Sequence, residues 1–166
     1  MAIGSAFLRF YNFLANLGLV LRDDPPKVVD LTGREWGATV NGLALSIRQV
    51  PKHDPEEQAV LSVVIRNAGR DRKTFIVPGW LFFYEVEITA QNGAGVSRTF
   101  YGDKLLTTER KTERLEVSLD AGEARDTDVP LGALYAMRRG DSYRVRVLSK
   151  LDDRTEVTSN EIAVRA

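Results

Sequence analysis

Cysteine is absent from the 166 residues of this chain, and histidine occurs once. These absences exclude disulfides, thiolate catalysis and zinc sites of the Cys/His type. Neither sign of charge is in excess, since 23 lysines and arginines balance 23 aspartates and glutamates. A chain so balanced has no overall electrostatic attraction to nucleic acid or to an anionic membrane. What is present, 43% hydrophobic and 28% charged residues, is typical of one globular domain with a short appendage.

Residues 2–21 differ in kind from the rest of the chain. Their only charge is Arg9, which forms a narrow polar stripe with Asn12 and Asn16 at helical spacing. Two prolines at 25 and 26 then prevent a helix from continuing. We therefore predict an apolar, amphipathic helix within residues 1–24 and a linker over 25–35. The residues expected to contact a membrane or a partner are Phe7, Leu8, Phe10, Tyr11, Phe13, Leu14, Leu17, Val20 and Leu21.

Four roles are open to this helix. A cleavable signal peptide needs basic residues first and an uninterrupted apolar core, and Arg9, Asn12 and Asn16 depart from that pattern. A membrane span fits the length, with Arg9 on the cytoplasmic side and the body outside. The helix could also lie in a membrane interface or dock on a partner, or fold back onto the protein's own core. We favour an anchoring or docking helix, and a membrane-associated protein whose body is extracytoplasmic, in the periplasm or at the cell surface.

The period of the apolar residues changes from 3.6 to 2 in the rest of the chain. Alternating stretches occur around residues 43–48, 61–66, 84–88, 115–119, 143–147 and 162–165, and turn-forming residues separate them. Each stretch predicts a strand with one buried and one solvated face. No helical pattern of 10–15 residues intervenes, so a parallel sheet is not expected. Residues 36–166 are predicted to form an all-β, two-sheet antiparallel sandwich.

Three segments carry a resemblance to a known architecture. Residues 134–147, LYAMRRGDSYRVRV, resemble the E–F corner of immunoglobulin-like and fibronectin III-like domains, and Tyr143 matches the tyrosine of that corner. Residues 118–123 and 61–69 resemble, respectively, the turn before that corner and strand B in bacterial versions. The resemblance implies an immunoglobulin-like sandwich in which the Tyr143 hydroxyl bonds to upstream backbone. Unlike antibody domains, this chain lacks the cysteine pair.

Candidate catalytic and metal-binding residues are few. His53 lies in a proline-bounded charged loop, where we expect it to be solvated. The paired carboxylates lack the pattern of a calcium loop, and Glu85 and Glu87 alternate as on a solvated strand face. Gly93-Ala94-Gly95 lacks the third glycine and following helix of a phosphate loop, so a turn is expected. We expect that the protein is not an enzyme and that it binds neither a cofactor nor a metal.

Arginines gather near the end of the chain without forming a strong basic patch. Arg138, Arg139, Arg144 and Arg146 approach such a patch, but Asp141 and neighbouring carboxylates dilute it. Nucleic-acid binding is therefore not expected.

The most unusual part of the body is residues 75–84, which are apolar or aromatic on both sides of Pro78-Gly79. The turn at Pro78-Gly79 prevents the whole run from being strand interior, and an apolar patch in a loop favours an interaction surface. On that interpretation Val77, Trp80 and Phe82 contact a partner. The competing interpretation places Trp80 at one end of the core.

These observations favour a non-catalytic structural or interaction protein. We expect an accessory subunit, tethered by its N-terminal helix to a membrane-associated or multi-protein complex. The alternative is a ligand-binding or proteinase-inhibitor-like module, for which the loops at 51–57 and 107–112 are candidate contact regions.

Overall fold

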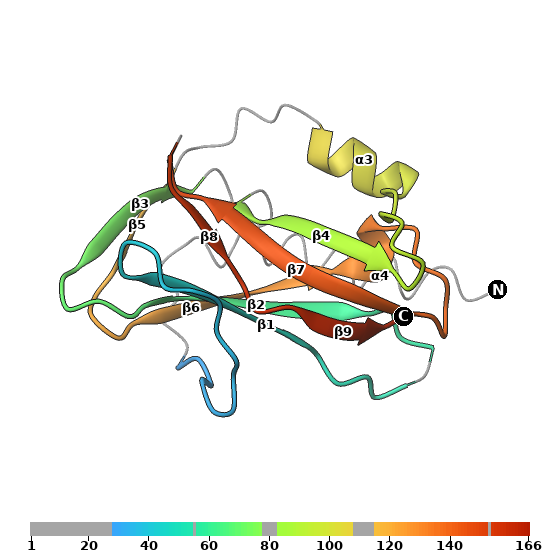
Figure 1. Ribbon diagram of the computed structural model, residues 1–166, viewed down its shortest axis with the longest axis horizontal. Helices are drawn as coiled ribbons and strands as arrows, with labels where there is room; N and C mark the ends of the chain where they lie inside the picture. Colours follow the sequence, from blue (N-terminus) through green and yellow to red (C-terminus); the bar gives the residue numbers. More distant parts are fainter. Residues whose placement is uncertain (1–27, 55, 78–82, 108–114, 153) are drawn as a thin grey trace.

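The computed structural model describes residues 28–54, 56–77, 83–107, 115–152 and 154–166. Nearly all of their regular structure is antiparallel β-strand (Figure 1). The elements in chain order are β1 (Leu43–Gln49), β2 (Val60–Asn67), β3 (Lys73–Val77), β4 (Glu85–Ala90), α3 (Phe100–Thr107), β5 (Leu115–Leu119), β6 (Ala124–Pro130), α4 (Leu131–Leu134), β7 (Ser142–Lys150), β8 (Glu156–Thr158) and β9 (Ile162–Arg165).

The strands pair into two main sheets and a small one. One sheet has the order β1-β2-β6, and in the other β7 pairs with β4 along one edge and with β8 and β9 along the other. Strands β3 and β5 form a separate pair. One continuous hydrophobic core draws side chains from all three sheets. The largest fully buried ones include Leu45, Leu61, Ile65, Leu119 and Val145.

Strand β7 shows why the alternating stretches become strands. Tyr143, Val145 and Val147 are buried, whereas Arg144 and Arg146 between them are exposed. Successive side chains of a strand point to opposite faces, so this alternation places every apolar residue against the core. The prediction of an antiparallel β body is confirmed for the described strands, but the body is mostly β and not all-β, because it also contains α3 and α4.

The prediction of one solvated face is wrong for β1 and β2. On the face away from the core, Ser46 and Val64 are fully buried. The cause is the segment before β1, residues 28–37, which we call the strap. The Arg34 guanidinium donates to the Ser62 hydroxyl at 2.7 Å, and the Arg66 guanidinium lies 4.4 Å from the centre of the Trp36 ring. The strap therefore covers a face that alternation alone assigns to solvent.

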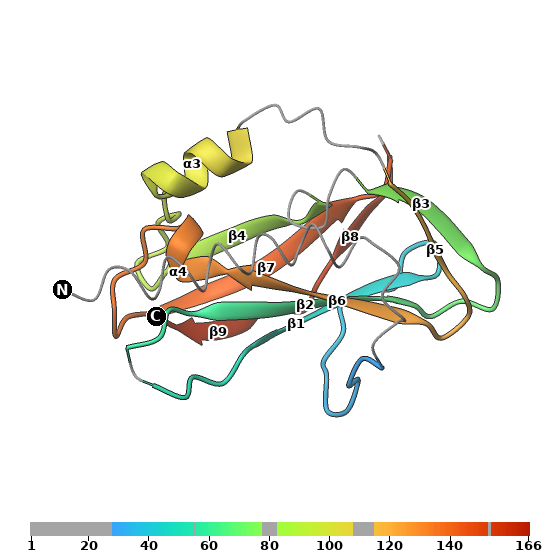
Figure 2. The same cartoon turned by 180° about the vertical axis from the view of Figure 1, so that it is seen from behind.

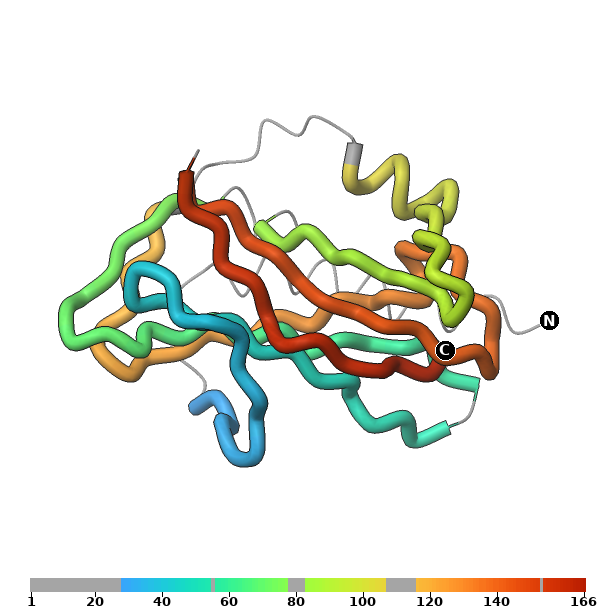
Figure 3. The backbone as a smooth tube through the Cα atoms, viewed as in Figure 1, coloured from blue at the N-terminus to red at the C-terminus, as the bar shows by residue number. Residues whose placement is uncertain are grey.

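The outer edge of β1 is joined to the second sheet. The Gly37 amide donates to the Leu45 carbonyl at 2.9 Å, and the Asn160 side-chain amide bonds both the amide and the carbonyl of Ile47, at 2.8 and 3.1 Å. The Gln49 side chain bonds the backbone of Arg165 in the same way. Figure 3 shows the strap in blue, running beside β1 and β8. These contacts satisfy backbone groups that an edge strand otherwise leaves unpaired.

The two described helices lie together at the end of the molecule that carries the C-terminus (Figure 2). The Thr99 hydroxyl accepts from the Gly102 amide at 2.9 Å, which caps the start of α3. The same hydroxyl donates to the Ala133 carbonyl in α4 at 2.7 Å. Gly102 faces the Leu134 carbonyl so closely that a Cβ would overlap it. A glycine at this position therefore lets the two helices touch.

The expected role of Tyr143 is confirmed. Its ring is buried, and its hydroxyl accepts a hydrogen bond from the Arg138 amide at 2.7 Å. The hydroxyl thus holds the turn before β7 against the start of that strand, the arrangement of a tyrosine corner.

Replacing Tyr143 by phenylalanine should lower the free energy of unfolding by about 1 kcal/mol, because one partly buried hydrogen bond is lost while the ring stays in the core. Urea unfolding of both proteins measures this difference. An unchanged midpoint and slope would show that the hydroxyl contributes nothing to stability.

The predicted N-terminal helix, residues 1–24, lies outside the described residues. Among the helices that the structure does describe, none is both long and apolar enough to cross a membrane.

Candidate functional site

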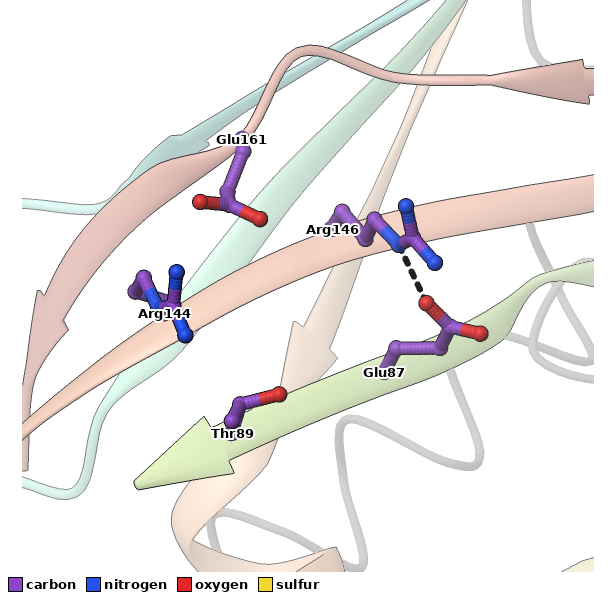
Figure 4. Close-up of a pocket in the computed structure, with 5 residues that line it drawn as sticks. All are labelled: Glu87, Thr89, Arg144, Arg146 and Glu161. Atoms are coloured by element: carbon purple, nitrogen blue, oxygen red, sulfur yellow. Dashed lines mark hydrogen bonds and ion pairs between the residues drawn. The ribbon is translucent and has the colours of Figure 1, made fainter. Parts of the chain in front are cut away.

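A shallow polar hollow lies on the outer face of the β4–β7–β9 sheet (Figure 4). Five side chains from β4, β7 and the residue before β9 line it: Glu87, Thr89, Arg144, Arg146 and Glu161.

Strand register arranges these side chains in two rows across the sheet. Glu87 of β4 is opposite Arg146 of β7. Glu161, the residue before β9, lies on the other side of β7, between Arg146 and Arg144 in Figure 4. We call these three residues row one. In the next row, Thr89 is opposite Arg144, and Arg144 is opposite Ala163 of β9. These three residues are row two.

In row one the single cation, Arg146, already has an ion-pair partner. The Arg146 guanidinium forms an ion pair with the Glu87 carboxylate, drawn as a dashed line in Figure 4. The hydrogen bond and charge of Glu87 raise the pKa of Arg146, and the charge of Glu161 adds to the effect. The side chains of Arg146 and Glu87 are 48% and 41% exposed, so water screens this ion pair and its contribution to stability is small.

Row two leaves its cation without an opposite charge directly across from it on β4 or β9. The Arg144 side chain is exposed, and the residues opposite it are Thr89 and Ala163. Within the part of the chain that the structure describes, its guanidinium forms neither an ion pair nor a hydrogen bond. Arg144 is therefore the side chain of the hollow that is ready to take an anionic group.

The hollow offers guanidinium donors, one hydroxyl and two carboxylates. No group of three or more His, Cys, Asp or Glu residues that could hold a metal ion occurs in residues 28–54, 56–77, 83–107, 115–152 and 154–166.

Of the predicted contact residues, the structure describes only Val77. The others lie outside the described residues: Phe7, Leu8, Phe10, Tyr11, Phe13, Leu14, Leu17, Val20, Leu21, Trp80 and Phe82. Val77 is described and is fully buried at the end of β3, where it pairs with Leu115.

Other predicted features of the surface are seen directly. His53 is exposed, as expected for its loop, and its backbone amide donates to the Glu57 carboxylate at 2.9 Å. Gly93 lies in a turn with a φ of 84°, so the prediction of a turn at Gly93-Ala94-Gly95 is confirmed. Among the residues that the structure describes, the most exposed large apolar side chains after Val28 are Phe100 and Ile76.

Sequence reasoning noted Arg144 and Arg146 but did not separate them, and it missed Thr89 and Glu161. Alternation alone shows that both arginines point outward. Which arginine has a carboxylate neighbour depends on the register of β7 against β4, more than 50 residues away along the chain.

Comparison with known proteins gives no family. No family model matches the chain, and no curated protein matches it. Five chains of solved structures do match. Two are structures from Bacteroides uniformis. One is a β-glucuronidase with 17% identity and a TM-score of 0.34. The other is β-glucuronidase 2 covalently bound to cyclophellitol-6-carboxylate aziridine, with 18% identity and a TM-score of 0.32. Each match covers 72% of this chain but only 12% of the enzyme chain. A likeness this low assigns the protein neither a fold family nor an activity.

Proposed function

We propose that residues 36–166 form an immunoglobulin-like β-sandwich that serves as a non-catalytic interaction module. In this proposal the protein is an accessory subunit, and its N-terminal segment tethers it to a membrane-associated or multi-protein complex. The tyrosine corner at Tyr143 and the core between two antiparallel sheets support the fold assignment. The composition of residues 2–21, apolar apart from one narrow polar stripe, supports the tether.

The attachment of the strap is the observation that carries this proposal. A tether positions a domain only if the chain between them is fixed to the domain. Arg34 bonds Ser62, and the Gly37 amide bonds Leu45, so the strap is held at both β2 and β1. Asp30 adds a hydrogen bond from the Thr32 amide, which lowers the pKa of its carboxyl group, and an ion pair to Arg48. The strap would therefore transmit to the body a pull from the segment that precedes it.

The location of the body is part of the same proposal. A segment that crosses or enters a membrane with Arg9 toward the cytoplasm would place the body in the periplasm or at the cell surface.

The test adds the same charge to opposite sides of the predicted helix in the full chain. In one variant Phe7 and Leu14 become glutamate on the apolar side; in the matched control Asn12 and Asn16 become glutamate on the polar stripe. We expect the first variant to lose about tenfold or more of its membrane- or complex-bound fraction, because each buried carboxylate costs about 2.5–3.5 kcal/mol at mid-membrane. Fractionation of cell extracts with size-exclusion chromatography measures the distribution.

Two results would contradict the proposal. One is a wild-type chain that stays monomeric and free of both membranes and larger complexes. The other is a fall in the melting temperature of the apolar-side variant alone, with no change in its distribution. That result would show that the helix packs on the protein's own core.

A further inference from the structure

The outer faces of the two main sheets differ in one decisive respect. The β1–β2–β6 face is covered by the strap, whereas the β4–β7–β9 face presents Glu87, Arg144 and Glu161 in a hollow. The covered face shows how this protein binds an extended segment. We call the second face the open face, because Arg144 and Glu161 are exposed there among the described residues.

On the covered face, one charged side chain of the strap meets a hydroxyl and acidic groups of the sheet. Arg34 donates to the Ser62 hydroxyl. The carboxylates of Asp126 and Asp128, which lie opposite Val64 and Ser62 in β6, attract the same guanidinium. A cation from the bound segment is thus matched by a hydroxyl and anions on the sheet.

In row two of the open face the charges are reversed, because here the sheet supplies the cation. Row two presents Thr89 opposite Arg144. Charge-assisted hydrogen bonds from a guanidinium to a carboxylate are among the stronger polar contacts in proteins. The matching group on a bound segment is therefore a carboxylate.

Row one favours a basic residue in the bound segment. Glu87 and Glu161 flank the single cation Arg146, so this row has a net charge of −1 and repels a second carboxylate. Rows one and two are two residues apart along β7, about 6.8 Å in an extended strand. An extended peptide lying along β7 has the same repeat, so a lysine two positions from the acidic residue would lie over row one.

We propose that the outer face of the β4–β7–β9 sheet docks an extended segment of a protein partner that carries an acidic and a basic residue two positions apart. The Arg144 guanidinium and the Thr89 hydroxyl bind the carboxylate, and Glu87 and Glu161 attract the base. A polyanion such as nucleic acid is disfavoured by the same two carboxylates. This inference rests on the proposed role of the protein as an interaction module and names the surface that the module uses.

The test is a titration of the full-length protein with short peptides, followed by NMR. The probes are acetyl-Ser-Glu-Ser-Lys-Ser-amide, the same peptide with two glutamates, the same with two lysines, and the same with serine at every position. We expect the Glu/Lys peptide to shift the Arg144 side-chain Nε–H resonance and the amide resonances of Thr89 and Arg144. Arg144→Ala should weaken its binding about fivefold or more, as the loss of one charge-assisted contact implies. Arg154→Ala, which removes an exposed arginine in the turn between β7 and β8, is the matched control and should have no effect.

A charge reversal gives a second, positive readout. Arg144→Glu should shift the preference from the Glu/Lys peptide to the peptide with two lysines, because both rows would then be acidic. This gain of binding cannot arise from unfolding.

Four outcomes would overturn the inference. They are equal binding of the all-serine peptide, unchanged binding by Arg144→Ala, shifts of the same size from sodium acetate alone at equal concentration, and tighter binding of a single-stranded oligonucleotide. If one of these outcomes is found while the Phe7/Leu14 substitutions still release the protein from its complex in the fractionation test, only the docking surface has failed. If the wild-type chain forms no complex at all, the proposed function has failed.

Discussion

Asn67→Asp is expected to lower the free energy of unfolding by about 3–5 kcal/mol, although the two side chains have nearly the same shape. Asn67 is fully buried, and its side-chain amide donates to the carbonyls of Asp71 and Leu119 at 2.8 and 2.9 Å. Its side-chain oxygen accepts from the Gly69 amide. An aspartate would turn the two donor contacts into contacts between oxygens and would bury a charge without a partner.

The destabilisation should affect two turns, because backbone hydrogen bonds of Asn67 join them. Its backbone amide donates to the Glu123 carbonyl, and its own carbonyl accepts from the Gly122 amide. The turn after β2 and the turn between β5 and β6 are therefore held by one residue.

Urea unfolding measures the effect, and Asn92→Asp is the matched control. Asn92 is exposed, and its side-chain oxygen accepts from the Ala94 amide at 3.0 Å, a role that a carboxylate fills equally well. We expect the control to stay within about 0.5 kcal/mol of wild type, as is usual for surface substitutions. An Asn67→Asp protein as stable as the control would refute the assigned role.

Gly37→Ala should destabilise the protein by about 3 kcal/mol, at the upper end of the effects of overpacking. A Cβ at Gly37 would overlap the Thr158 carbonyl oxygen and lie 2.8 Å from the Ser159 carbonyl carbon. These are backbone atoms, which cannot rotate away as the end of a side chain can. Either the strap or β8 must therefore move, and the bond from the Gly37 amide to the Leu45 carbonyl is strained or lost.

Gly95→Ala is the control for this substitution. Gly95 has no heavy atom within 4 Å of the position of its Cβ, and its φ is not among the positive ones. Thermal unfolding compares the two variants, and hydrogen exchange at the Ser46 and Ser62 amides reports on the face beneath the strap. Equal stability of the two variants would mean that the strap does not need the close approach at Gly37.

The strands that sequence reasoning predicted best are those whose alternation is strong and whose outer face is solvated, such as β7. Strand β6 went unrecognised, because Asp126 and Asp128 on its outer face and Arg125 among the inward positions weaken its apolar pattern. The pairing of β3 with β5 also went unrecognised, because residues about 40 positions apart pair there and alternation carries no information about partners. The helix α3 is short and begins with the exposed Phe100, so its apolar spacing is weak.

The candidate site also has one feature that could be predicted from the sequence and one that could not. The outward direction of Arg144 and Arg146 follows from the period of β7 and could be predicted. The difference between them could not, because it depends on which residues of β4 and β9 lie opposite.

By itself the sequence determined which residues face inward and which face outward along most strands, because a period of two is a local property of the backbone. It also determined the tyrosine corner, since Tyr143 and Arg138 are only five residues apart. Only the tertiary structure decided that the strap covers the β1–β2–β6 face and leaves the other open. Only the tertiary structure, again, placed Glu87 beside Arg146 and Thr89 beside Arg144. Both results depend on register and packing between distant segments, where the free energy of the whole core selects one arrangement among many that the local pattern permits.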